Sequence, residues 1–233
     1  MKILAVDTAT EICSAGLIQG GEPRAEITLK LAASHSRHLV SAIDQLLKGA
    51  GWRLEELNAL AVTCGPGSFT GLRIGISALK GLALALDKPL VGVSTLEALA
   101  FQCRGTSRVI RPMLDGRRGQ VFTNHYRFSG GRLKSLGQER ALSPQEAVAE
   151  IGEPTLLVGN GAQLYRELLE AGLPGYIQLG SDIQHRIHGI SVAQVAHDTL
   201  RGRKGAAHFD PGRLGPVYIR KPDAKLPKIS EIY

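Results

Sequence analysis

The segment around residue 68 combines groups that could act as nucleophiles. Cys64 precedes a glycine-rich turn, and Ser68 and Thr70 carry hydroxyl groups within it. A serine nucleophile on a strand-to-helix turn needs the spacing G-x-S-x-G, which this turn lacks, and no motif pairs a histidine with the thiol. The two hydroxyls come directly before an apolar helical pattern, where such side chains cap helix ends. We therefore interpret them as capping residues and Cys64 as a buried thiol.

Pairs of histidines occur twice at a spacing that a metal site can use. His35 and His38 are three residues apart at the expected start of a helix, and His185 and His188 repeat this spacing in an expected loop. No third ligand is obvious near either pair, although a protein zinc site has at least three protein ligands. We therefore predict that this chain binds no metal.

The composition is that of an ordinary globular protein. The chain has 233 residues, of which 43% are hydrophobic and 21% charged, which excludes disordered, collagen-like and low-complexity classes. The net charge of +7 is unevenly distributed: residues 1–100 carry 9 basic and 9 acidic side chains, whereas residues 201–233 carry 8 and 3. A basic end suits an anionic partner or serves only to solvate the chain, and both interpretations stay open.

The cysteines and the first residues indicate a reducing compartment. Cys13, Cys64 and Cys103 are odd in number and lack C-x-x-C spacing, so a disulfide framework is not expected. The chain reaches Asp7 too early for a signal peptide. The longest apolar run, at 72–86, falls short of the roughly 20 residues of a membrane-spanning helix. We expect a cytoplasmic protein that does not enter the membrane.

Hydrophobic periodicity divides the chain into two similar halves. Each half is expected to run strand, Asp-containing turn, strand, glycine turn, helix, strand, glycine-rich turn and helix, which indicates an α/β duplication with mixed sheets. We predict an N-terminal lobe over residues 1–103, a C-terminal lobe over 104–221 and a flexible tail over 222–233. Within the second half, one strand is expected at 120–128 and one helix at 163–171.

An apolar helix is predicted over residues 70–86, and two of its faces could be buried. One stripe consists of large side chains such as Leu72 and Leu79, and the neighbouring stripe consists mostly of small ones such as Gly75 and Ala78. One face can cover the sheet while the other packs against a partner helix, because small residues allow close approach. Packing against the preceding helix of the same lobe is the alternative. We favour the partner contact.

Several motifs along the chain match one known family. The most specific is the run G-P-G-S-F-T-G-L-R-I-G at 65–75. On these motifs the chain resembles the bacterial TsaB (YeaZ) family along nearly its whole length, although Gly116 stands where the family usually has alanine. The matching segments lie at 3–10, 65–75, 88–97, 114–122, 158–162 and 216–220.

The resemblance implies the duplicated fold of actin, Hsp70 and the sugar kinases, with ribonuclease H-like lobes. It also implies a role in forming N6-threonylcarbamoyladenosine at position 37 of tRNAs that read codons beginning with A. In that role the chain would be a non-catalytic scaffold that binds the paralogue TsaD, with TsaE as a further partner and tRNA reached through the complex. ATP and a metal ion are expected on TsaD, no cofactor is expected on this chain, and a homodimer is expected to form in isolation.

Residues 95–99 argue against catalysis by this chain. TsaD-type paralogues have His-Leu-Glu-Gly-His here, and the two histidines lie on one helical face, where they reach one metal ion. Thr95 and Leu99 replace both ligands in this sequence. A standalone ATPase or a peptidase-like hydrolase of the same fold is the alternative, and the missing histidines weigh against it.

The resemblance also assigns two candidate nucleotide turns. Asp7, Thr8 and Thr10 stand where relatives of this fold hold phosphate on a glycine turn, but an alanine lies between the two threonines and restricts the backbone. Gly159 and Gly161 stand at the adenosine side. Vestigial nucleotide binding is one interpretation of both turns. A carboxylate that caps its own turn and a tight strand-to-helix connection are the alternatives.

Contacts with other molecules are assigned to two further sets of residues. Five arginines lie between positions 104 and 118, and we single out Arg117 and Arg118 as candidates for tRNA phosphate contact, with a solvated surface as the alternative. The partner contact is assigned to the two long helices of the first lobe. Its candidate residues are Leu39, Ile43, Leu46, Leu72, Gly75, Ile76, Leu79, Leu82 and Ala83.

Overall fold

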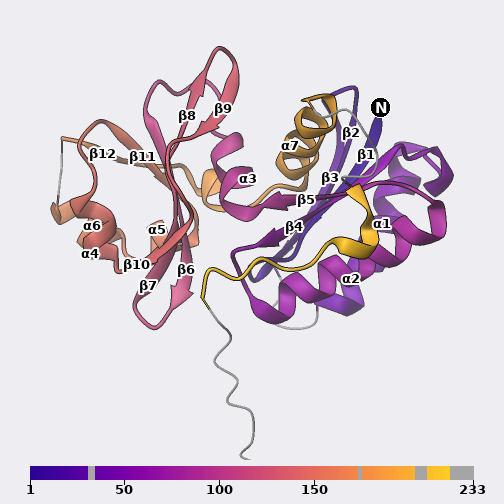
Figure 1. The fold of residues 1–233 in the computed structure, drawn as a ribbon, viewed down its shortest axis with the longest axis horizontal. Helices are drawn as coiled ribbons and strands as arrows, with labels where there is room; N and C mark the ends of the chain where they lie inside the picture. The colour runs from indigo at the N-terminus through magenta and orange to yellow at the C-terminus, as the bar shows by residue number, and fades with distance from the viewer. Residues whose placement is uncertain (31–34, 173–174, 203–208, 221–233) are drawn as a thin grey trace, which may run out of the picture.

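The structure is a computed structural model that describes residues 1–30, 35–172, 175–202 and 209–220. Two lobes lie side by side, and each is built on one mixed sheet (Figure 1). The predicted α/β duplication is therefore confirmed. The tail predicted at 222–233 lies outside the described residues.

The N-terminal lobe contains a five-stranded sheet in the order β3-β2-β1-β4-β5. The first three strands form an antiparallel meander, whereas β4 and β5 run parallel to β1. The continuous apolar runs of β1 and β4 occupy central positions, as expected of strands that are buried on both faces. The strands are β1 (Lys2–Asp7), β2 (Ile12–Gln19), β3 (Glu22–Lys30), β4 (Ala59–Gly65) and β5 (Leu90–Ser94).

Helices cover both faces of this sheet (Figure 1). α1 (His35–Ala50) and α2 (Phe69–Leu86) pack on one face, and α7 (Gly189–Gly202) packs on the other. α3 (Thr95–Phe101) lies between the lobes, where it contacts α7 and β6 (Val109–Arg117). The last α-helix among the described residues therefore belongs to the lobe that the first strands form.

Residues 209–220, called the strap below, also return to the N-terminal lobe (Figure 1). The Lys80 ammonium of α2 donates to the carbonyls of Gly212 and Leu214, at 3.1 and 3.0 Å. The predicted C-terminal lobe over 104–221 is therefore too long, because α7 and the strap pack on the other lobe. Sequence order did not show this, since both segments follow the second half without any break in pattern.

The described residues of the C-terminal lobe form a sheet of seven strands. Five follow the order β10-β7-β6-β11-β12, and β8 pairs with β6 and with β9. The strands after β6 are β7 (Gln120–Thr123), β8 (Tyr126–Ser129), β9 (Arg132–Ser135), β10 (Arg140–Leu142), β11 (Thr155–Val158) and β12 (Ile177–Leu179). The helices of this lobe are α4 (Pro144–Ala149), α5 (Asn160–Leu164) and α6 (Arg166–Gly172).

Two predicted elements of this lobe are interrupted. The strand expected at 120–128 breaks at Asn124, whose side-chain oxygen accepts from the N–H of His125 at 2.8 Å, so β7 pairs with β10 whereas β8 pairs with β9. The helix expected at 163–171 breaks at Tyr165, where φ is −107° and ψ is 23°. The apolar pattern continues across both breaks, and periodicity therefore did not reveal them.

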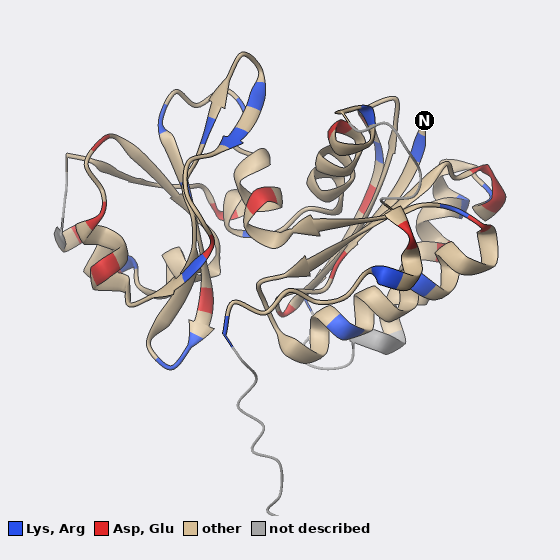
Figure 2. Ribbon diagram, viewed as in Figure 1, with Lys and Arg blue, Asp and Glu red and all other residues tan. Residues whose placement is uncertain are grey.

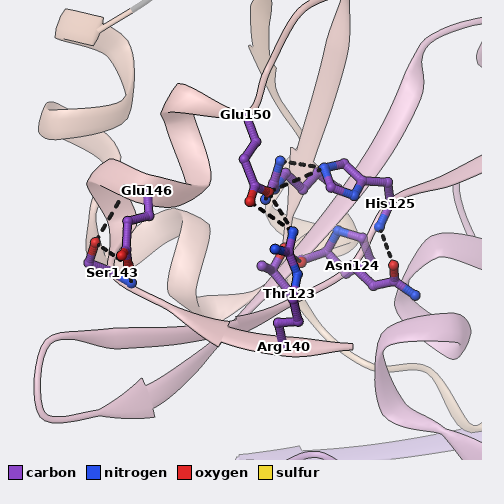
Figure 3. A network of polar contacts seen from close by, with 9 residues as sticks. Thr123, Asn124, His125, Arg140, Ser143, Glu146 and Glu150 are labelled. Atoms are coloured by element: carbon purple, nitrogen blue, oxygen red, sulfur yellow. Dashed lines mark hydrogen bonds and ion pairs between the residues drawn. The ribbon is translucent and has the colours of Figure 1, made fainter. Parts of the chain in front are cut away.

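A polar network joins β6, β10 and α4 inside this lobe (Figure 3). Arg111 of β6 is fully buried and donates to Glu150 at 2.7 Å and to His125. Arg140 of β10 donates to both oxygens of the same carboxylate at 2.8 Å. Burial raises the pKa of Glu150, but the hydrogen bonds from the two arginines outweigh that effect and hold the pKa below its usual range. The carboxylate therefore stays ionised beside the buried guanidinium.

Candidate functional site

The glycine-rich segment after β4 packs directly on the turn between β1 and β2. Ser68 caps α2 by accepting from the N–H of Gly71 at 3.2 Å, as its position before the helix predicted. The N–H of Ser68 donates to the carbonyl of Ala9 at 2.7 Å, and the Thr8 hydroxyl donates to the carbonyl of Gly71 at 2.7 Å. Two hydrogen bonds thus hold the start of α2 against the turn.

Glycine is required along this edge of α2 because no larger residue fits. A Cβ atom would lie 2.6 Å from the Ala9 carbonyl oxygen at Gly67 and 2.1 Å from the Thr8 carbonyl oxygen at Gly71. At Gly75 it would lie 2.4 Å from the Thr8 hydroxyl oxygen. Backbone approach this close is a characteristic use of glycine. The glycines of the motif at 65–75 therefore allow α2 to pack closely on the turn between β1 and β2.

Asp7 is enclosed by this packing. Its Oδ1 accepts from the Thr63 hydroxyl at 2.7 Å and from the N–H of Ala9 at 3.1 Å, whereas Oδ2 has no hydrogen-bond partner among the described residues. Burial raises the pKa of Asp7 to about 7. Asp7 and Thr8 have no exposed surface, and the Thr10 hydroxyl accepts from the backbone N–H two residues further on. The structure thus places the predicted phosphate turn under α2, with its carboxylate capping its own backbone.

The second predicted nucleotide turn is also filled by protein. Gly159 has a φ of 101°, and Cβ atoms at Gly159 and Gly161 would lie 2.4 and 2.9 Å from the carbonyl oxygen of Met113 in β6. His185 closes the other side, with Nδ1 3.1 Å from the oxygen of Gly159 and Nε2 2.9 Å from that of Gly180. These glycines form a tight strand-to-helix connection, and His185 is part of its packing.

The two positions at which the resemblance leads us to expect metal ligands in TsaD-type paralogues lie inside the molecule. Thr95 and Leu99 are fully buried on α3. Ser94 caps this helix, and its hydroxyl donates to Glu139 of the other lobe. Burial raises the pKa values of Glu97 and Glu139, and the charge of Glu139 raises that of Glu97 further. In the parts of the chain that the structure describes, no group of three His, Cys, Asp or Glu side chains is placed to hold a metal ion.

The predicted partner-contact residues face inward, and this prediction is corrected. Eight of the nine are buried, and Leu82 is half-buried. The eight buried residues attach α1 and α2 to the sheet and are not available to another molecule, whereas Leu82 keeps part of its surface exposed. The buried residues are Leu39, Ile43, Leu46, Leu72, Gly75, Ile76, Leu79 and Ala83.

The opposite side of α2 carries a different stripe, called the outer face below. A Cβ atom at Gly81, in the middle of this stripe, would meet no atom within 4 Å, and the neighbouring Leu84 is 62% exposed. By length and composition α2 is apolar enough to cross a membrane, yet only 33% of it is buried in the structure. The outer face consists of the exposed and half-buried residues Ile74, Ser77, Ala78, Gly81, Leu82 and Ala85.

Arg117 and Arg118 lie at the tip of the hairpin between β6 and β7. Both are exposed and have positive φ angles, 62° and 54°. Asp115 accepts from the N–H of Arg117 at 2.8 Å and lies 3.5 Å from its guanidinium. The structure thus places both candidate arginines on the surface, whereas the two candidate nucleotide turns are enclosed.

The two mixed sheets define a two-lobed protein of the actin-like class, which also includes sugar kinases. Component A of the (R)-2-hydroxyglutaryl-CoA dehydratase of Acidaminococcus fermentans shares this fold with a TM-score of 0.55 at 12% identity, covering 86% of this chain and 99% of that chain. TsaB of Bacillus subtilis is 32% identical over 230 residues, which cover 97% of this chain and 96% of the relative. The chain belongs to the TsaB (YeaZ) family.

Two further comparisons agree with this assignment. YeaZ of Pseudomonas aeruginosa has a TM-score of 0.76 at 27% identity and covers 93% of this chain and 99% of its own. The family model of TsaD, described as tRNA N6-adenosine threonylcarbamoyltransferase, matches residues 28–208. The resemblance predicted from the sequence motifs is therefore confirmed.

Proposed function

We propose that this chain is a non-catalytic subunit that binds a TsaD-type paralogue during formation of N6-threonylcarbamoyladenosine at position 37 of tRNAs that read codons beginning with A. The outer face of α2 carries the proposal, because Gly81 at its centre is exposed and a Cβ atom there would meet no atom within 4 Å, although Ile74, Ala78 and Leu82 also pack on the core. The pathway is supported by relatives that are named tRNA threonylcarbamoyladenosine biosynthesis protein TsaB.

The shape of the outer face suits a helix of similar fold. Its residues recur at steps of three and four, so they form one line along the helix. Small side chains at Ser77, Ala78, Gly81 and Ala85 allow a second helix to approach to about 8 Å between axes. The match of the TsaD model to residues 28–208 includes α1 and α2, so a TsaD-type paralogue has helices that correspond to them. A second copy of this chain would use the same face in the absence of the partner.

The catalytic groups of the reaction belong to the partner in this proposal. Thr95 and Leu99 offer no metal ligand, and α2 encloses the turn at Asp7. ATP and a metal ion are therefore assigned to the TsaD-type subunit, with TsaE as a further subunit, and tRNA is bound by the assembled complex in the cytoplasm. The same two observations weigh against a standalone ATPase or a peptidase-like hydrolase.

The test is tRNA threonylcarbamoylation by TsaD, TsaE and the threonylcarbamoyl-adenylate donor, with and without this chain, together with size-exclusion chromatography of the mixture. We expect modification to require the chain and the chain to elute with TsaD. Equal modification without the chain, and no joint elution, would reject the proposal.

Variants of the outer face separate partner binding from folding. Ala85→Arg is expected to abolish both joint elution and modification, because it places a charge in the stripe. Gly81→Ala adds one methyl group where space is open and is expected to keep both. Ala171→Arg, on the exposed end of α6, is the matched control for the added charge. Leu79→Glu would unfold the lobe instead, because Leu79 is fully buried.

A further inference from the structure

We infer that Ser94, Glu97 and Glu139 form a proton-dependent contact that holds the two lobes together. Ser94 ends β5 of the N-terminal lobe, Glu97 lies on α3 between the lobes, and Glu139 directly precedes β10 of the C-terminal lobe (Figure 1). These three residues are called the junction cluster below. The inference concerns the chain by itself and does not rest on the proposed function.

The hydroxyl of Ser94 links the two lobes through hydrogen bonds. It accepts from the N–H of Glu97 at 3.2 Å and thereby caps α3, and it donates to Oε1 of Glu139. A serine hydroxyl has one proton to donate, so this arrangement requires an oxygen of Glu139 that accepts. The cap of α3 and the carboxyl group of the other lobe therefore depend on the same hydroxyl.

Neither carboxyl of the junction cluster has a cation to compensate its charge. Glu97 and Glu139 are both half-buried, and no ion pair joins either of them to another described residue. α3 itself carries an acidic residue and no basic one (Figure 2). An ionised carboxyl that loses water without gaining a counterion is unfavourable, and a second carboxylate beside it adds repulsion. The cluster is therefore more stable with one proton than with none.

Glu97 is the member of the cluster that holds the proton. Burial raises the pKa values of both glutamates. The hydrogen bond from Ser94 opposes this effect on the pKa of Glu139, whereas the charge of Glu139 raises the pKa of Glu97 further. Cys64 of β4 and Tyr126 of β8 also interact with both glutamates. Burial, and then the charges of Glu139 and Glu97, raise the pKa of each, so both stay protonated in the neutral range.

Apolar contacts hold the same junction independently of pH. The rings of Phe101 on α3 and Phe128 on β8 have their centroids 6.2 Å apart. Leu99 of α3 packs at Gly159 of the C-terminal lobe, where an added Cβ atom would lie 3.3 Å from the leucine side chain. Loss of the proton therefore weakens one part of the contact between the lobes and leaves the apolar part in place.

The expected change is a rotation of one lobe away from the other as pH rises. When Glu97 loses its proton, two carboxylates repel each other across the junction. Hinge motion of this kind is common in proteins of two lobes. Because the closed arrangement raises the pKa of Glu97, that arrangement is favoured at low pH and is lost as pH rises through the raised pKa.

The test is amide hydrogen exchange of the full chain, followed by mass spectrometry at about pH 6 and about pH 8 and corrected for intrinsic exchange rates. We expect the protection of peptides from α3 and β8 to fall by about three- to tenfold at the higher pH, since one shifted carboxyl changes an equilibrium by at most about tenfold per pH unit. Equal protection of these peptides at both pH values would overturn the inference.

Two variants assign the effect to the junction cluster. Glu97→Gln keeps the shape of the protonated carboxyl without its titration, so α3 and β8 should be equally protected at both pH values. Glu139→Gln should keep part of the pH effect, because Glu97 stays half-buried but loses its charged neighbour. Glu167→Gln, on an exposed position of α6, is the matched control and should behave as the unmodified chain does.

Peptides from β1 and β4 separate opening of the junction from unfolding of the N-terminal sheet. Asp7 contributes to the pH dependence of that unfolding, so these peptides should respond to pH in the same way in all four proteins. A pH dependence of α3 and β8 that is unchanged in Glu97→Gln would contradict the inference. If Glu97→Gln does not fold, Glu139→Gln decides: a smaller pH effect supports the cluster, and an unchanged one overturns it.

Discussion

Gly16 of β2 and Gly189 of α7 touch through their backbones. A Cβ atom on Gly16 would lie 2.3 Å from the nitrogen of Ile190, and one on Gly189 would lie 2.4 Å from the nitrogen of Gly16. Two strand side chains cap the helix at this contact: Ser14 accepts from the N–H of Gly189 at 2.9 Å, and Glu26 accepts from that of Ile190 at 3.0 Å. Two strands near the start of the chain thus supply the cap of α7.

Gly16→Ala should loosen this contact strongly. The added methyl group meets backbone atoms that cannot rotate away, so we expect the free energy of unfolding to fall by about 3 kcal/mol in denaturant titrations. Gly49→Ala in α1 adds the same methyl group where no atom lies within 4 Å, and it should stabilise the chain by about 0.5–1 kcal/mol. Equal stability of the two variants would contradict the backbone contact.

The ion pair of His188 and Glu26 should make stability depend on pH. The hydrogen bond that His188 donates to Glu26 raises the pKa of His188 above its usual value of 6.5. Burial raises the pKa of Glu26, but the hydrogen bonds from His188 and Ile190 bring it below its usual value of 4.5. The contribution of His188 to the free energy of unfolding is complete below pH 6.5 and is lost as pH rises through its raised pKa. The contribution of Glu26 is complete above pH 4.5 and is lost as pH falls through its lowered pKa.

The variant that tests this pair is His188→Gln. We expect it to destabilise the chain by about 2 kcal/mol at about pH 6, where both partners are charged, and by clearly less at about pH 9. Chemical denaturation of both proteins at the two pH values measures the difference. A loss that is the same at both pH values would show that the charge of His188 does not contribute.

Asp7 should make the protein less stable as pH rises. Burial raises its pKa from 3.8 to about 7. The contribution of Asp7 to the free energy of unfolding is therefore complete below pH 3.8 and is lost as pH rises through the pKa of the folded state. Over this range the slope is at most about 1.4 kcal/mol per pH unit. Asp7→Asn keeps the shape without the titration and should flatten the curve of stability against pH between these values. Asp44→Asn, on exposed α1, is the control, and an identical change in both variants would refute the assignment to Asp7.

Because Arg111 is buried in the C-terminal lobe, we expect two variants of its ion pair to lose different amounts of stability. Glu150→Ala leaves Arg111 buried without its carboxylate and should cost about 3–5 kcal/mol. Arg111→Met removes the buried charge and leaves Glu150 partly exposed and still paired with Arg140, so it should cost clearly less. Thermal unfolding of the two variants gives the comparison, and a larger loss for Arg111→Met would contradict this account of the network.

The sequence predicted best those elements whose hydrophobic pattern directly reflects which of their faces are buried. The runs of β1 and β4 are apolar throughout because both of their faces are covered, and the two-lobed class followed from the repeated order of elements. The capping role of Ser68 followed from a local rule. The breaks at Asn124 and Tyr165 did not follow, because a side-chain hydrogen bond and a change of backbone angle leave the hydrophobic period intact.

The candidate sites were less predictable because they depend on which surfaces meet. The small residues of α2 suggested a partner face, but Gly75 packs on Thr8 within the lobe, whereas Gly81, six residues further on and on another side of the helix, faces outward. The basic character of Arg117 was visible in the sequence. The hydrogen bond between Arg220 and Gln120 of the same hairpin was not, because the two residues lie 100 positions apart in the chain and meet only through the strap.

The sequence by itself determined the fold class, the family and the absence of histidine at positions 95 and 99, since each of these depends on residue type at fixed local spacing. Only the tertiary structure decided that α7 and the strap complete the N-terminal lobe, that the turn at Asp7 is closed and that Ser77, Gly81 and Ala85 of α2 are exposed. The physical reason is that burial depends on two surfaces that are often distant in the chain. The sequence shows which faces of a helix or strand are apolar, but it does not show which other element covers each face.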